Sequence, residues 1–137
     1  MERTPARLYA GVVGAVLVAA GIIGFFYSSS FGSPGDVDPV FGILDINGWH
    51  NLVHIATGTL GLLAYNGGPG PSRTYALFLG VVYICVAFAG FIYGDGEAIL
   101  GFVPVNTEDN VFHALLGVGG LAAASARRRR VVPAPAA

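Results

Sequence analysis

Charged side chains are scarce in this sequence: they make up 11% of its 137 residues, whereas hydrophobic residues make up 54%. Soluble globular domains carry about 25% charged residues, so the composition argues against a soluble domain. Lysine is absent, and all seven basic residues are arginines. The single cysteine, Cys85, excludes a disulfide within one chain and lies in an apolar run, where it is interpreted as a packing residue.

Four apolar segments are candidates for membrane-spanning helices, which need about 20 residues to cross the hydrocarbon core. They cover approximately residues 8–31, 49–65, 74–93 and 110–126. Gly and Pro residues break the pattern at 33–36 and 66–72. The sequence therefore predicts an all-α fold, an integral membrane four-helix bundle in one domain (residues 1–126), with an Arg-rich tail at 127–137.

The distribution of charge predicts the orientation of the spans. All arginines fall at the chain ends or in the loop between the second and third spans; they are Arg3, Arg7, Arg73 and Arg127 to Arg130. The other two loops hold seven of the eight acidic residues. The positive-inside rule then predicts a multi-pass protein of the bacterial inner (plasma) membrane with both termini cytoplasmic. The arginine run after the fourth span is interpreted as an anchor, so no nucleic-acid partner is expected.

A twelve-residue motif occurs twice. The segments that begin at Asn51 and at Asn110 both read N-x-x-H-x-x-x-G-x-x-G-L, and upstream at the same offset Gly21 falls opposite Gly80. A duplicated two-helix hairpin explains these matches, with repeat units at about 8–65 and 74–126. Two spans per unit predict a parallel repeat related by a pseudo-two-fold axis along the membrane normal.

The spacing of the motif places its Asn, His and Gly positions on one helical stripe, because residues three and four apart are neighbours on a helix. The stripe residues are Asn51, His54, Gly58 and Gly61 in the first copy, and Asn110, His113, Gly117 and Gly120 in the second. Small residues permit close helix packing in membranes, and Asn and His can form hydrogen bonds between helices. We expect the stripe to face the bundle interior, with Asn47 and Asn106 in the N-cap regions of these helices.

The two Asn–His segments, together with the stretch Phe102-Val-Pro-Val-Asn-Thr107, resemble a bacterial, mainly actinobacterial, family known as domain of unknown function 4383. The resemblance covers roughly residues 5–126. It implies a four-helix inner-membrane protein without an assigned activity, and it gives Asn51, His54, Asn110 and His113 no established role.

Several functions remain open at this point. The first is structural: paired Asn–His side chains hold the hairpins together in a scaffold or accessory subunit, as a homo-oligomer or in a larger membrane complex. The second is a ligand site, because imidazole binds transition metals and haem. Its candidate ligands are His54 and His113, with His50, Asp109 or Glu108 nearby. His50 beside Trp49 is most simply an interfacial residue.

Two further function classes have weaker support. Repeated hairpins are found in transporters, but the predicted spans carry no acidic residue or arginine deep inside them. Enzymatic chemistry would rest on a Ser–His pair between residues 28–30 and His54, without any recognisable catalytic motif. The sequence therefore predicts a membrane protein that is not an enzyme, with no catalytic residue assigned.

Overall fold

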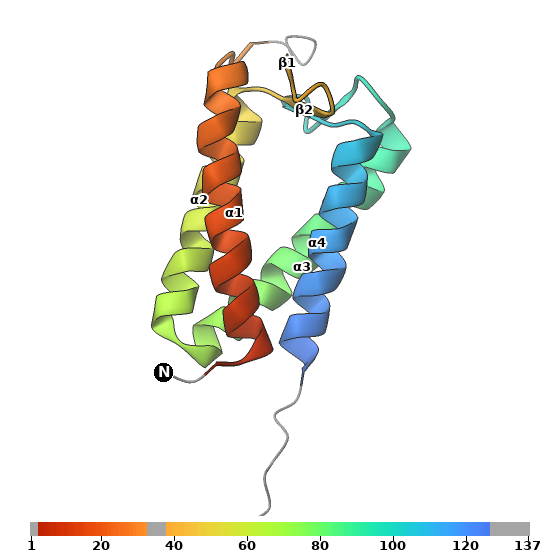
Figure 1. Ribbon diagram of the computed structural model, residues 1–137. Coiled ribbons are helices and arrows are strands. Elements are labelled where there is room, and N and C mark those ends of the chain that lie inside the picture. The colour runs from red at the N-terminus through yellow and green to blue at the C-terminus, as the bar shows by residue number, and fades with distance from the viewer. Residues whose placement is uncertain (1–2, 33–37, 127–137) are drawn as a thin grey trace, which may run out of the picture.

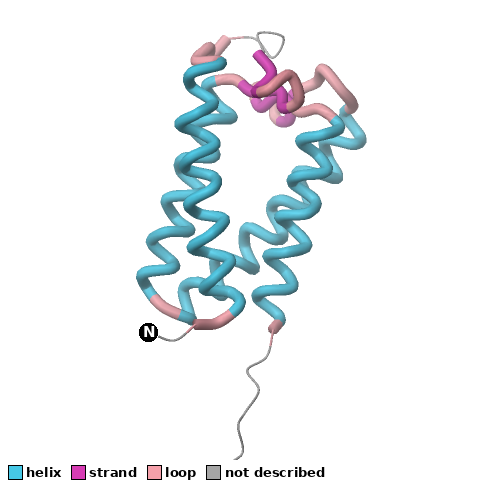
Figure 2. Tube along the Cα trace, viewed as in Figure 1, coloured by secondary structure: helices cyan, strands magenta, loops and turns pink. Residues whose placement is uncertain are grey.

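The computed structural model describes residues 3–32 and 38–126. This described part of the chain contains four helices: α1 (Pro5–Tyr27), α2 (Gly48–Gly67), α3 (Pro69–Tyr93) and α4 (Thr107–Ser125). Two antiparallel hairpins cover one end of the bundle (Figure 1, Figure 2). Their strands are β1 (Asp38–Val40), β2 (Leu44–Ile46), β3 (Ala98–Ile99) and β4 (Val103–Pro104). The expected Arg-rich tail and the expected break at 33–36 lie outside the described residues.

Two of the helices, α1 and α3, are long and apolar enough to cross a membrane. The end of α1 and the start of α3 differ from the sequence prediction. The first helix ends at Tyr27 rather than near residue 31, because Ser28 adopts an extended conformation. The break predicted over 66–72 is a single residue, Gly68, with φ of +96°. Pro69 can begin α3 directly, because the first helical residue needs no intrahelical N–H bond.

The helices pack in two pairs, α1 with α2 and α3 with α4 (Figure 1). Glycines bring the backbones of each pair into contact. A β-carbon on Gly14 would lie 2.9 Å from the carbonyl oxygen of Gly58, and one on Gly80 would lie 3.1 Å from that of Gly117. Gly80 therefore makes the contacts of Gly14. The constant offset predicted that Gly80 corresponds to Gly21, and this prediction is wrong. The segment between α1 and α2 is seven residues longer than that between α3 and α4. Matching positions in α1 and α3 are therefore seven residues further apart in the sequence than matching positions in α2 and α4.

Each β-hairpin turns through two residues with positive φ. These are Phe41 and Gly42 (55° and 72°) in the first hairpin, and Leu100 and Gly101 (54° and 77°) in the second. Two successive residues with positive φ match the twist of the flanking strands. The sequence prediction of an all-helical chain omitted both hairpins, because strands of two or three residues are too short to show an alternating pattern.

Reciprocal hydrogen bonds join the two helix pairs at the hairpin end. The side-chain amide of Asn47 donates to the carbonyl of Phe102 at 2.7 Å, and that of Asn106 donates to the carbonyl of Ile43 at 2.7 Å. Each asparagine also accepts from a backbone N–H in the first turn of its own helix. One side chain thus begins a helix and connects it to the opposite hairpin.

At the other end of the bundle, arginines bind the last carbonyls of the second helix in each pair. Arg7 Nε donates to the carbonyl of Tyr65 at 3.0 Å, and Arg73 Nε donates to that of Ala124 at 2.9 Å. The guanidinium of Arg7 also lies over the Tyr65 ring, 4.8 Å from its centroid. Positive charge near a helix C-terminus is stabilising, so these arginines stabilise the ends of α2 and α4.

Candidate functional site

Three histidine rings gather between the helix pairs, just below the β-hairpins. His50 and His54 lie one turn apart on α2, with ring centroids separated by 4.5 Å. His113 on α4 lies 6.0 Å from His50 and 6.5 Å from His54. One ring nitrogen from each residue lies within 4.8 Å of the other two. These three side chains are called the histidine cluster below.

His50 lies at the centre of this cluster, and its interpretation as an interfacial residue is wrong. Its side chain is 1% exposed, and it lies in the first turn of α2, one turn before His54. Its Nδ1 lies 3.1 Å from the carbonyl oxygen of Asp45. A carbonyl can only accept, so Nδ1 carries the proton and Nε2 bears a lone pair. That Nε2 is buried without a hydrogen-bond partner.

His113 has a similar unmet requirement. It is 6% exposed, and its buried Nδ1 has no hydrogen-bond partner. The ring of Tyr83 packs edge-on against it with a centroid separation of 5.0 Å. A buried polar atom without a partner costs about 1–3 kcal/mol. Unpartnered nitrogens on two adjacent imidazoles therefore indicate a site built for something that binds nitrogen lone pairs.

The asparagines of the repeated motif do not face the histidine cluster. The side-chain amide of Asn51 donates to the carbonyl of Ser28 at 2.8 Å, and its oxygen lies against Gly24 of α1. Asn110 likewise places its side-chain oxygen against Gly90 of α3. The predicted stripe is thus divided: the asparagines contact the first helix of their own pair, and the histidines turn toward the space between pairs.

Like the asparagines, the stripe glycines contact the first helix of their own pair, and they do not face the histidine cluster. Gly58 packs on the backbone of Gly14, and Gly61 packs against Tyr75 and Ala10. Gly117 and Gly120 make corresponding close contacts with α3, Gly120 with the carbonyl of Ala76. All four are buried. Their expected role in close packing is consistent with these contacts.

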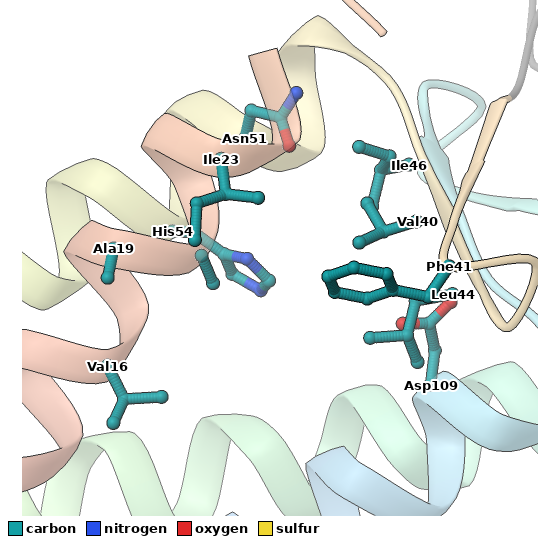
Figure 3. Close-up of a pocket in the computed structure, with 11 residues that line it drawn as sticks. Val16, Ala19, Ile23, Val40, Phe41, Leu44, Ile46, Asn51, His54 and Asp109 are labelled. Carbon is teal, nitrogen blue, oxygen red and sulfur yellow. The ribbon is translucent and has the colours of Figure 1, made fainter. Parts of the chain in front are cut away.

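A pocket of about 320 Å³ opens beside the cluster (Figure 3). The ring of His54 projects into it from α2, opposite Phe41 and Leu44 of the first hairpin, and Asp109 lies across the pocket. The rest of its wall is almost wholly apolar; it includes Val16, Ala19, Ala20, Ile23, Val40, Ile46 and the side chain of Asn51. His54 is therefore shared between the cluster and the pocket.

Asp109 lines this pocket and is connected to His50 through the backbone of Asp45. Its carboxylate accepts from the N–H of Asp45 at 3.0 Å, and the carbonyl of the same residue accepts from His50. Asp109 precedes the fourth predicted span. Burial, together with the nearby carboxyls of Asp45 and Glu108, raises the pKa of Asp109 to about 7. Burial is also the main cause that raises the pKa of Asp45.

The sequence singled out His54 and His113 as paired candidates, and it placed His50 and Asp109 only in their neighbourhood. His50 and Asp109 occupy the same position in the two copies, four residues before the shared histidine. A search for identical residues in the copies therefore passes over both. The useful signal was the helical spacing from His50 to His54, which places two imidazoles on one face.

Comparisons with known proteins identify the family but no activity. The model of one protein family matches residues 7–126, and its description is domain of unknown function (DUF4383). No curated protein and no solved structure matches the chain. Because the match covers most of the sequence, the protein belongs to the DUF4383 family.

Proposed function

We propose that the protein is a four-span membrane protein made of two tandem hairpins, and that it binds one transition-metal ion in its histidine cluster. The apolar α1 and α3 support insertion in a bilayer. The matching contacts of Gly14 and Gly80, and the reciprocal bonds of Asn47 and Asn106, support a duplicated hairpin. The arginines at one end and the acids at the other support cytoplasmic termini.

The observation that carries the metal proposal is the set of three imidazole nitrogens within 4.8 Å of one another. Zinc–nitrogen bonds are about 2.0–2.1 Å long, so small ring rotations would bring all three nitrogens onto one ion. The bond from His50 Nδ1 to the Asp45 carbonyl is typical of metal-binding histidines, which donate their other ring N–H to a carbonyl or carboxylate.

The chemistry of the cluster limits which ion it suits. Three imidazoles favour zinc, copper, iron or nickel over the oxygen-binding ions magnesium and calcium. Three protein ligands also leave one position open, as in catalytic zinc sites. The half-buried His54 faces the pocket, so the open position would be reached from there.

Haem binding by His54 and His113 is less favoured. A haem between their rings would need space for the whole macrocycle around the line that joins them. His50 occupies part of that space, with its ring 4.5 Å from His54 and 6.0 Å from His113. A single ion uses this third ring as a ligand, whereas a haem would have to displace it.

Metal analysis of the purified protein tests the proposal. The protein is stripped with a chelator in detergent, reloaded with zinc, copper or cobalt, and analysed for bound metal. We expect about one ion per chain, and Co²⁺ should give the visible bands of a site with low coordination number. Each of the variants His50→Gln, His54→Gln and His113→Gln should weaken binding by at least tenfold.

A matched control separates coordination from packing. Tyr83→Phe keeps an aromatic ring beside His113 and leaves the three imidazoles of the histidine cluster unchanged. It should bind metal like the unmodified protein. Folded protein that binds no metal after reloading, or equal binding by the histidine variants, would reject the metal site and leave the structural role for these side chains.

A further inference from the structure

We propose that the pocket beside His54 binds the hydrocarbon chain of a neutral amphiphile, such as a long-chain alcohol, that enters sideways from the bilayer. The proposal rests on the placement of α1 in the membrane and not on the presence of a metal ion. It assigns an occupant to a cavity that the helix packing leaves open between α1, α2 and the first hairpin.

The wall of the pocket defines the apolar part of the occupant. Eight of its eleven lining residues are apolar: Val16, Ala19, Ala20, Ile23, Val40, Phe41, Leu44 and Ile46. The other three are Asn51, His54 and Asp109. A volume of about 320 Å³ is at the lower end of ligand pockets, which span roughly 300–1,000 Å³. It suits one chain rather than a whole phospholipid.

The residues of α1 indicate how the occupant enters. Val16 and Ile23 line the pocket and are also 55% and 45% exposed. These side chains stand at the border between the pocket and the outer surface of the helix. With α1 in the bilayer, that surface faces lipid, so the mouth of the pocket opens into hydrocarbon. A molecule already dissolved in the membrane reaches the pocket without crossing water.

Of the three polar residues in the pocket, Asn51 is held by the carbonyl of Ser28 and packs against Gly24. His54 and Asp109 therefore specify the head of the occupant (Figure 3). A carboxylate or phosphate head would be repelled by the Asp109 carboxyl when that group is ionised. A hydroxyl can donate to a carboxylate and can accept from, or donate to, an imidazole. The pair therefore favours a neutral, hydroxyl-bearing head over an anionic one.

The chain offers a matched pair of variants for the test. Ala19→Phe fills the pocket from α1. Cys85→Phe adds a similar ring at the position of α3 that corresponds to residue 19 when Gly14 is aligned with Gly80, and Cys85 is exposed and not part of this pocket. Ala19 and Cys85 are both exposed residues of long apolar helices, so the two added rings should have similar effects on folding.

The protein is reconstituted in phosphatidylcholine vesicles with a photoreactive dodecanol analogue, and the crosslinked residues are mapped by mass spectrometry. We expect labels within 16–23 and 40–46, a loss of at least tenfold in Ala19→Phe, and unchanged labelling in Cys85→Phe. Unlabelled dodecanol should compete at a concentration at least tenfold lower than dodecanoate at pH 8. Equal labelling of α1 and α3, insensitive to Ala19→Phe, would overturn the pocket, and equal competition would overturn the neutral head.

The same experiment on chelator-stripped protein separates this inference from the metal proposal. Labelling of the pocket should persist without metal, because the chain is held by the apolar wall. Persistent labelling in a protein that binds no metal would support the pocket and reject only the metal site. Labelling that disappears in stripped, folded protein would overturn the inference as stated.

Discussion

The side-chain oxygen of Asn51 lies directly against the backbone of Gly24, so that a β-carbon at residue 24 would overlap it. Gly24→Ala is therefore expected to lower the free energy of unfolding by about 1–3 kcal/mol, the usual cost of inserting a methyl group into a packed interior. Thermal unfolding in detergent, followed by the loss of monodisperse protein, measures this change.

Gly70→Ala is the control for that substitution. Gly70 lies in the first turn of α3 with nothing within 4 Å of an added β-carbon, and alanine favours helix over glycine. It should leave the stability unchanged or raise it slightly. Adding Asn51→Ala to Gly24→Ala should recover part of the loss, because the overlapping oxygen is removed; a loss as large as with Asn51 present would contradict the contact.

Asn47→Asp separates the two tasks of that asparagine. The aspartate still accepts the N–H of His50 as an N-cap, but it cannot donate to the carbonyl of Phe102. We expect a loss of about 1–3 kcal/mol from the carbonyl left without its donor. Asn66→Asp removes a comparable donor from an exposed bond within α2 and should cost much less. Equal effects in thermal unfolding would show that the bond between the helix pairs contributes no more than a surface bond.

The proposed orientation predicts which cysteines an impermeant maleimide reaches in intact cells. In a Cys85→Ser background, Glu97→Cys lies before β3 in the hairpin end and should react without permeabilisation. Asn66→Cys lies at the opposite end of the bundle, in the last turn of α2, and should react only after the membrane is opened. The reverse pattern would invert the orientation, and reaction of both in intact cells would contradict the four-span arrangement.

Stability should depend on pH through Asp109. Its pKa is raised from an ordinary value of 3.8 to about 7, mainly by burial, so the folded chain holds this proton more tightly than the unfolded chain does. The resulting stabilisation is complete below about pH 4 and is lost as the pH rises through 7. The melting temperature should fall between pH 5 and pH 8, and Asp109→Asn should flatten that fall.

Glu97→Gln is the charge control for Asp109. It removes an exposed carboxylate from the same end of the molecule, and the slope of melting temperature against pH should match that of the unmodified protein. A steep fall that survives in Asp109→Asn would assign the pH dependence to other groups, of which Asp45 and Glu108 are the acids nearest to Asp109.

The helices were predictable because long apolar runs and glycines at fixed spacing depend on local sequence. The positions of the stripe glycines and of the caps at Asn47 and Asn106 follow from the same local rules. The hydrogen bonds from these caps to Phe102 and Ile43 could not be predicted from local sequence, because they join segments that only the folded chain brings together. His50 was among the candidate ligands, but its burial was not predicted, because its ring packs under the Asp45 carbonyl of the first β-hairpin and sequence periodicity does not reveal that contact.

The exchange of His50 for Asp109 at one position of the two copies has a consequence for symmetry. The pair of helices α1 and α2 carries two imidazoles toward the centre, and the pair of helices α3 and α4 carries one imidazole and a carboxyl. A symmetric dimer of the α1–α2 pair alone would bring four histidines together, which is enough to enclose a tetrahedral ion completely. This chain instead brings three histidines together and places an acid at the edge of the pocket beside them. Its centre is therefore asymmetric and has one accessible side.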